Sequence, residues 1–102
     1  MKDIYKYIDD NVEEYIKDLQ EFIRKPSVSA QKLGLEECAN YVVEKMHKDG
    51  LPAELYDIPD GPPLVFGHLK SSNSKKTMFC YSHYDVQPPE PIEEWSHGGP
   101  WS

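Results

Sequence analysis

The chain has 102 residues, of which 38% are hydrophobic and 28% charged. This length suits one domain with a modest core, and the composition is that of a globular chain rather than a disordered one. Eleven Lys and Arg residues stand against 18 Asp and Glu residues, a formal net charge of -7. Because an acidic chain without a basic stripe repels phosphate groups, nucleic acid and an anionic membrane surface are excluded as expected partners.

The chain carries no recognisable targeting or membrane-spanning segment. No apolar run approaches the roughly 18 residues needed to cross a bilayer, and residues 1–6 include an acid and no apolar stretch of the kind found in secretory signals. The two cysteines, Cys38 and Cys80, are too few and too far apart in sequence for a disulfide framework or a four-ligand zinc site. We therefore expect a cytoplasmic chain with reduced thiols.

Two helices are predicted in the first half of the chain. Residues 3–24 carry one apolar stripe with steps of three and four, formed by Ile4, Ile8, Val12, Tyr15, Ile16, Leu19 and Ile23. Asp3 is a candidate N-cap, and Pro26 ends this helix. The second helix is predicted over residues 35–48, followed by Gly50 at a position that favours a left-handed conformation.

Beyond Gly50 the pattern changes from helical to extended. Three strands are predicted, over residues 53–58, 63–69 and 77–82. The third is a nearly unbroken run of apolar and small residues, which indicates a strand at the centre of a sheet. Residues 85–102 are rich in Pro, Gly and Trp and are expected to be irregular. The predicted fold class is α/β, with two helices packed on a three-stranded mixed or partly parallel sheet.

The most informative segment places His83 and Asp85 two positions apart, directly after the third predicted strand. In extended backbone these two side chains point the same way. A carboxylate beside an imidazole can accept its ring N–H, fix its tautomer and raise its basicity toward a metal. His83 is therefore a candidate metal ligand and Asp85 a candidate catalytic residue that orients it. From the spacing alone, a surface ion pair is the alternative.

The other histidines have simpler explanations. His47 lies in the last turn of the second predicted helix, where a cation suits the helix dipole. His68 is expected in a strand with a local hydrogen bond, and His97 becomes a ligand only if the tail folds back. Cys80 is expected to point away from the side of His83 and to act as a small core residue.

A resemblance to a known family rests on a longer motif, the string His83-Tyr84-Asp85-Val86-Gln87-Pro88 followed by Trp95 and Pro100-Trp101. The motif resembles that of the dinuclear-metal aminoacylase and carboxypeptidase family of metallopeptidases, in its carnosinase-type dipeptidase branch. The Pro-Ser-Val-Ser connection at residues 26–29 agrees with it, and the resemblance covers essentially the whole chain. The family has Gly where this chain has Ser82, and Pro-Phe where this chain has Pro100-Trp101.

The resemblance implies that residues 1–102 are the N-terminal portion of a catalytic domain, an incomplete piece of a larger three-layer α/β domain. In that family the His matching His83 binds one of two metal ions, usually zinc and sometimes manganese or cobalt, and the Asp matching Asp85 holds the imidazole. The implied reaction is hydrolysis of peptide or N-acyl amide bonds by a metal-activated water, with dipeptides or N-acyl amino acids as substrates.

The family's later ligands are absent from this sequence. After Asp85 the remaining candidates are Glu90, Glu93, Glu94 and His97, whereas a catalytic zinc commonly needs three protein ligands. We therefore expect the isolated chain to be inactive and to bind at most one metal ion weakly. Two alternatives stay open: a non-catalytic metal-binding module, and a homo-oligomer that forms through an exposed sheet edge or through the tail that carries Trp95 and Trp101.

Overall fold

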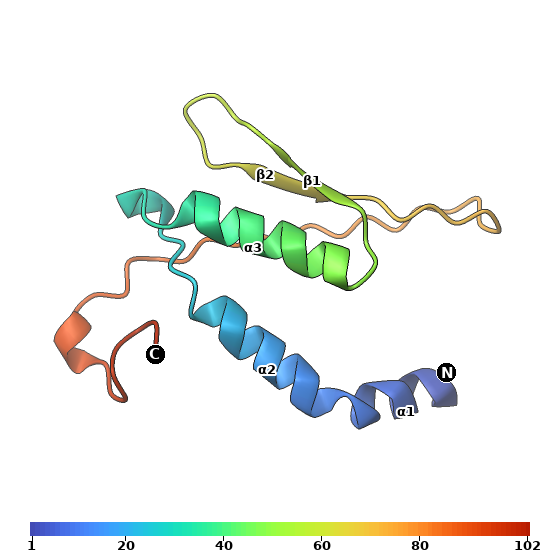
Figure 1. The fold of residues 1–102 in the computed structure, drawn as a ribbon, viewed down its shortest axis with the longest axis horizontal. Helices are drawn as coiled ribbons and strands as arrows, with labels where there is room; N and C mark the ends of the chain where they lie inside the picture. The colour runs from blue at the N-terminus through green and yellow to red at the C-terminus, as the bar shows by residue number, and fades with distance from the viewer.

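The computed structural model describes residues 1–102, which form three α-helices and one two-stranded sheet (Figure 1). The molecule is flat, with extents of 51 × 38 × 19 Å. None of the helices combines the length and the apolar composition that crossing a membrane requires. The α/β class is confirmed in this small form, although the arrangement differs from the predicted one in three places.

The first predicted helix is interrupted and forms two helices, α1 (Lys2–Asp10) and α2 (Val12–Ile23). Asn11, between them, has φ -115° and ψ 9°, and its side-chain amide donates a hydrogen bond of 2.7 Å to the carbonyl oxygen of Tyr7. Asparagine weakens helices through such local bonds to the backbone, which explains the break. The prediction of Asp3 as N-cap was wrong, because Met1 is the N-cap of α1 and Asp3 lies in its first turn.

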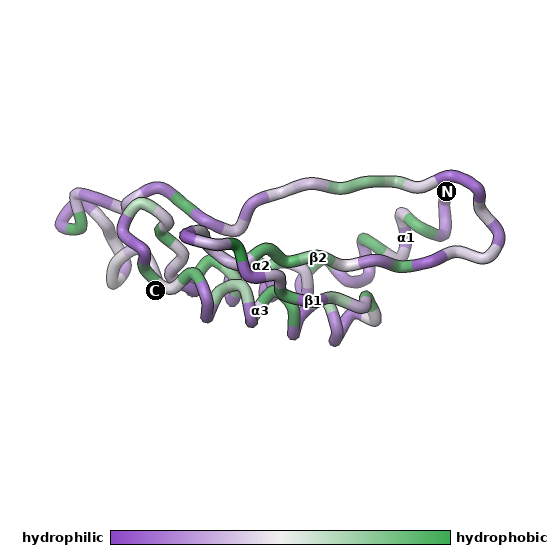
Figure 2. The backbone as a smooth tube through the Cα atoms, turned by 90° about the horizontal axis from the view of Figure 1, so that it is seen from above, coloured by the Kyte–Doolittle hydropathy of each residue, from purple (hydrophilic) through white to green (hydrophobic).

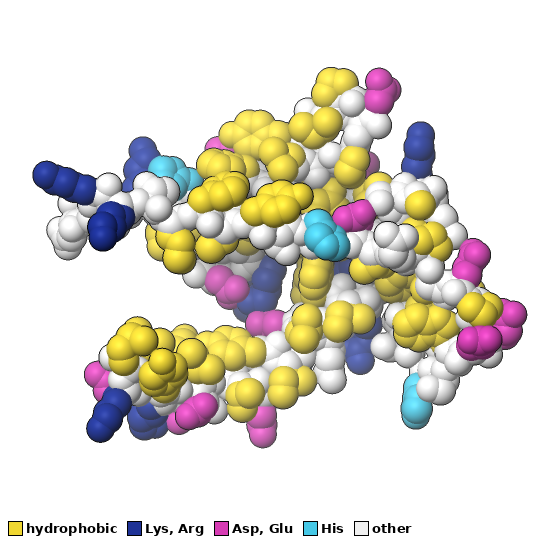
Figure 3. All heavy atoms as spheres, turned by 180° about the vertical axis from the view of Figure 1, so that it is seen from behind, with side chains coloured by type: hydrophobic (Ala, Val, Ile, Leu, Met, Phe, Trp, Pro, Cys, Tyr) yellow, Lys and Arg dark blue, Asp and Glu magenta, His cyan; other side chains and the backbone are white.

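The apolar stripe of α1 and α2 faces solvent over much of its length. Its side chains are 42 to 55% exposed, at Ile4, Ile8, Val12, Tyr15, Ile16, Leu19 and Ile23. Figure 3 shows hydrophobic side chains gathered along these helices. The pattern therefore predicted helical structure correctly, but the described residues supply little that could cover this face.

The second predicted helix, α3, spans Leu35–Lys48, the predicted bounds. It ends as predicted, with Gly50 at φ 81° and its N–H bonded to the carbonyl oxygen of His47. Glu36 and Glu37 in the first turn complement the positive end of the helix dipole.

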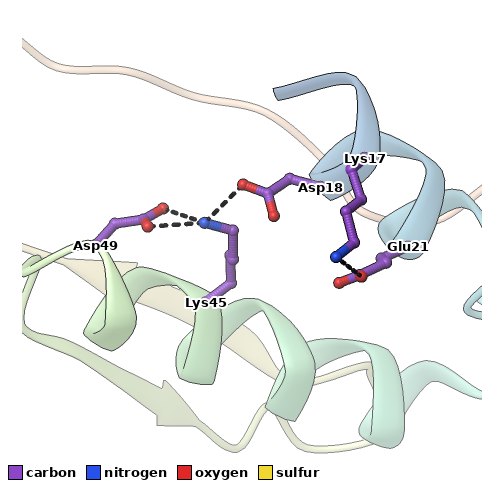
Figure 4. A network of polar contacts seen from close by, with 5 residues as sticks. All are labelled: Lys17, Asp18, Glu21, Lys45 and Asp49. Atoms are coloured by element: carbon purple, nitrogen blue, oxygen red, sulfur yellow. Dashed lines mark hydrogen bonds and ion pairs between the residues drawn. The ribbon is translucent and has the colours of Figure 1, made fainter. Parts of the chain in front are cut away.

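Helix α2 packs on α3 and not on the sheet, which corrects the predicted arrangement of two helices on one sheet. The rings of Phe22 and Tyr41 stack with centroids 6.3 Å apart. The ammonium group of Lys45 lies 3.0 Å from a carboxylate oxygen of Asp18 and 2.7 Å from one of Asp49, so it joins the two helices (Figure 4). The helix that packs against both strands of the sheet is α3.

The sheet contains β1 (Ala53–Tyr56) and β2 (Leu64–Gly67), paired antiparallel with Ala53 opposite Gly67. Both strands lie inside predicted ones, and the turn between them contains Asp60 with φ 60°. The terminal methyl of Met46 from α3 lies over Gly67, 2.4 Å from where a Cβ atom would stand, so this helix packs directly on the backbone of β2.

The predicted third strand, residues 77–82, does not form, and the sheet is two-stranded and antiparallel rather than three-stranded and mixed. Residues 69–85 take part in no backbone–backbone hydrogen bond, and Met78, Phe79 and Tyr81 are 80 to 86% exposed. Figure 2 shows this segment running apart from β2. A strand forms only where neighbouring strands satisfy its N–H and C=O groups, and no strand of the described chain lies beside residues 77–82.

The core is correspondingly small. Five residues are buried, and they come from the 27–28 connection, α3 and β1: Ser27, Val28, Cys38, Ala39 and Ala53. The prediction that Cys80 is a core residue was wrong, because it lies in the unpaired 77–82 segment and is exposed.

Candidate functional site

The connection between α2 and α3 forms a compact loop that supports the site. Its ends are paired, with backbone hydrogen bonds of 2.9 and 3.0 Å between Val28 and Leu33. Val28 is fully buried, which anchors the loop in the core. Gly34 closes the loop with φ 68°, and a methyl group there would collide with the carbonyl oxygen of Pro26. Ser29 follows Val28 and is therefore held in a fixed place at the surface.

The segment with the metallopeptidase-like motif docks against this loop and the hairpin rather than ending a strand. The N–H of Val86 donates a hydrogen bond of 2.8 Å to the carbonyl oxygen of Ser27. The hydroxyl of Tyr84 donates one of 2.7 Å to the carbonyl oxygen of Pro63. Burial is the main factor that raises the pKa of Tyr84, which keeps this hydroxyl a donor. These two bonds hold His83 and Asp85 near Ser29.

His83 and Asp85 lie in contact. The ring Nδ1 of His83 is 2.9 Å from the backbone carbonyl oxygen of Asp85 and 3.2 Å from its Oδ1. A carbonyl and an ionised carboxylate can only accept, so Nδ1 carries the proton. The lone pair of the neutral ring is then on Nε2, and the side chain is 74% exposed. This is the geometry of an oriented ligand, while the metal-binding role itself stays a prediction.

A third side chain, Ser29, completes the site and was missed by sequence reasoning. Its hydroxyl donates a hydrogen bond of 2.5 Å to Oδ2 of Asp85, 56 residues along the chain. This bond is the main factor that lowers the pKa of Asp85 below its ordinary value, with a smaller contribution from His83. The only sequence signal was that Ser29 belongs to the Pro-Ser-Val-Ser connection.

The described residues do not form a complete metal site. No group of three or more His, Cys, Asp or Glu side chains lies close enough together to hold an ion. Catalytic zinc commonly takes three protein ligands, and His83 with its orienting carboxylate supplies one. The chain as described therefore does not fit the two metal ions that the motif implies, and no reaction step through a metal can be assigned to it.

The remaining histidines lie apart from this site. The Nε2 of His47 is 2.8 Å from the carbonyl oxygen of Ala53, so the ring joins the end of α3 to β1. His68 lies just after β2 and donates its backbone N–H to Pro52. His97 lies in the tail, with Nδ1 2.8 Å from the hydroxyl oxygen of Ser96.

A mostly apolar cavity of about 360 Å³ lies next to the motif, between the end of α2 and the irregular tail. Phe22 and Ile23 line one side, and Trp95 and Trp101 line another. The indole N–H of Trp95 donates a hydrogen bond of 2.8 Å to Pro89. The tail is irregular as predicted, apart from one 3-10 turn at Ile92–Glu94, and its aromatic residues contribute to this cavity.

The relatives that match this chain in sequence are metallopeptidases or dipeptidases by name. No family model matches the chain. It is 35% identical over 105 residues to the Cys-Gly metallodipeptidase dug1 of Schizosaccharomyces pombe, a match that covers 91% of this chain and 22% of the relative. It is 27% identical to the Beta-Ala-His dipeptidase of Mus musculus, covering 93% and 22%.

The fold comparison agrees. The crystal structure of an M20 family metallo-carboxypeptidase from Sulfolobus solfataricus superimposes with a TM-score of 0.77 and 42% sequence identity, over 84% of this chain and 19% of that one. The chain spans about a fifth of the length of the curated relatives it matches.

Proposed function

We propose that this chain, which belongs to the M20 metallopeptidase family, forms the N-terminal portion of a catalytic domain that hydrolyses dipeptides or N-acyl amino acids. Its relatives are named for the hydrolysis of short peptides, Cys-Gly and Beta-Ala-His, and for carboxypeptidase action. For this chain's own domain we propose the substrate class only, namely dipeptides or N-acyl amino acids.

One observation carries the proposal: Asp85 holds His83 with Nδ1 as the donor, so that Nε2 is free and exposed. A carboxylate that accepts the other ring N–H is the usual partner of a metal-binding histidine. We propose His83 as a metal ligand and Asp85 as the residue that orients it. Zinc, manganese and cobalt all accept imidazole, so a single histidine does not select among them.

The catalytic steps belong, in this proposal, to residues that the 102-residue chain does not contain. One ligand with its orienting carboxylate does not hold a catalytic metal pair. We therefore expect no peptide hydrolysis by the isolated chain in the presence of zinc or manganese. The exposed apolar residues of α1, α2 and the 77–82 segment are the surfaces that would contact the rest of such a domain.

The test is a chimera in which this chain replaces the matching segment of the Sulfolobus solfataricus metallo-carboxypeptidase. Because the two are 42% identical and superimpose with a TM-score of 0.77, we expect the exchange to preserve the fold. We expect a peptidase that loses at least about 100-fold in activity on His83→Ala and about 10- to 100-fold on Asp85→Ala. The matched control is His97→Ala, in the tail, which should leave activity unchanged. A folded, inactive chimera, or an active His83→Ala chimera, would contradict the proposal.

Self-association is the second candidate, favoured by the exposed apolar side chains of residues 77–82. Because residues 77–82 make no backbone–backbone hydrogen bond, their free N–H and C=O groups can pair with a second copy of the chain. Size-exclusion chromatography with light scattering at two concentrations tests self-association by itself: a dimer at the higher concentration supports it, and a monomer at both concentrations refutes it.

A further inference from the structure

We infer that Ser29 is a positioning residue for His83, acting through the carboxylate of Asp85. The use of His83 as a metal ligand rests on the proposed function. The positioning itself concerns three side chains of this chain and can be measured without a metal.

The carboxylate of Asp85 is held by two different residues. Its Oδ1 lies 3.2 Å from Nδ1 of His83, and its Oδ2 accepts the hydroxyl hydrogen bond of Ser29 at 2.5 Å. The terminal torsion of an aspartate is broad and roughly two-fold, so a single partner leaves the plane of the carboxylate free to rotate. The second bond, from Ser29, fixes that plane and keeps Oδ1 directed at the imidazole.

Ser29 can act in this way because its own position does not depend on the motif. It follows the fully buried Val28, whose backbone pairs with Leu33. A separate bond, from the N–H of Val86 to the carbonyl oxygen of Ser27, docks the motif segment on the loop. Loss of the Ser29 hydroxyl should therefore free the carboxylate while the two segments stay together.

The effect on the imidazole should be partial. Nδ1 of His83 also lies 2.9 Å from the backbone carbonyl oxygen of Asp85, which no side-chain substitution removes. Ser29 therefore controls one of the two acceptors that favour the Nδ1–H tautomer. Losing the net free energy of one ordinary hydrogen bond changes the ratio of the two tautomers about fivefold.

The experiment measures that ratio in the full chain, labelled with ¹⁵N, at about pH 8, which is above the reference pKa of about 6.5 for an imidazole. Long-range ¹H–¹⁵N spectra of His83 distinguish Nδ1–H from Nε2–H. We expect the ratio to fall about fivefold in Ser29→Ala and to recover in Ser29→Thr, which keeps the hydroxyl. The matched control is Ser74→Ala, whose hydroxyl bonds only to the backbone of Lys76.

Hydrogen exchange of the Val86 amide separates positioning from general loosening. We expect it to be unchanged in Ser29→Ala. An unchanged tautomer ratio in Ser29→Ala would overturn the inference, and so would a fall in the ratio that is accompanied by faster Val86 exchange. If the ratio shifts while the chimera is folded and inactive, the proposed function fails and the positioning role stands. If the chimera is active and the ratio does not move, only the positioning role fails.

Discussion

Shortening Val28 tests whether the small core supports the candidate site. Val28→Ala removes two methyl groups from a side chain that is 0% exposed. At about 0.8 kcal/mol for each buried carbon, with a further term for the cavity, we expect a loss of about 2 kcal/mol in the free energy of unfolding. Single domains have free energies of unfolding of only about 5 to 15 kcal/mol. Because this chain has only five buried residues, a loss of this size is a large fraction of its free energy of unfolding.

Urea unfolding followed by circular dichroism measures the loss. The control is Val86→Ala, the same chemical change at a side chain that is 46% exposed, where we expect less than half the effect. Amide exchange gives a second readout: the Val86 N–H, bonded to Ser27, should exchange faster in Val28→Ala because the loop that accepts it is loosened. Equal losses in the two variants would refute the assignment of Val28 as the anchor of the site.

Two further pairs of variants test the loop and the contact between helices. Gly34→Ala should cost more than about 2 kcal/mol, since left-handed strain is joined by a collision with the backbone, whereas Gly50→Ala has open space and should cost about 1 kcal/mol; urea unfolding that gives equal losses would contradict this. Lys45→Met should cost about 1 kcal/mol and Lys17→Met under about 0.5 kcal/mol, because Lys17 reaches only Glu21, 4.0 Å away on its own helix. Asp49 and Asp18 raise the pKa of Lys45, so its contribution is complete at neutral pH and is lost only as the pH rises beyond the ordinary lysine range; a loss between pH 6 and 8 would oppose this.

Features set by neighbouring residues could be predicted from the sequence. Helix α3 has its apolar face, its charges and Gly50 within one short stretch, and its bounds were predicted correctly. The pairing of His83 with Asp85 follows from the two-residue period of extended backbone, which is equally local. The break at Asn11 was missed because the apolar period continues across it, although the asparagine itself was the signal.

Features that depend on distant partners could not be predicted in this way. Residues 77–82 have the composition of a central strand, but a strand also needs neighbours, and composition does not reveal whether they are present. The contact between Ser29 and Asp85 joins positions 56 residues apart, so no local pattern indicates it. The exposure of Cys80 follows from the missing strand rather than from the residue itself.

The central claim is that His83 is a metal ligand held in place by Asp85. The most direct measurement is the crystal structure of the zinc-loaded chimera, with the metal located by anomalous scattering. We predict zinc at about 2.0 to 2.1 Å from Nε2 of His83, with Nδ1 still directed at Asp85. Zinc bound without His83, or bound through Nδ1 with the contact to Asp85 broken, would contradict the account.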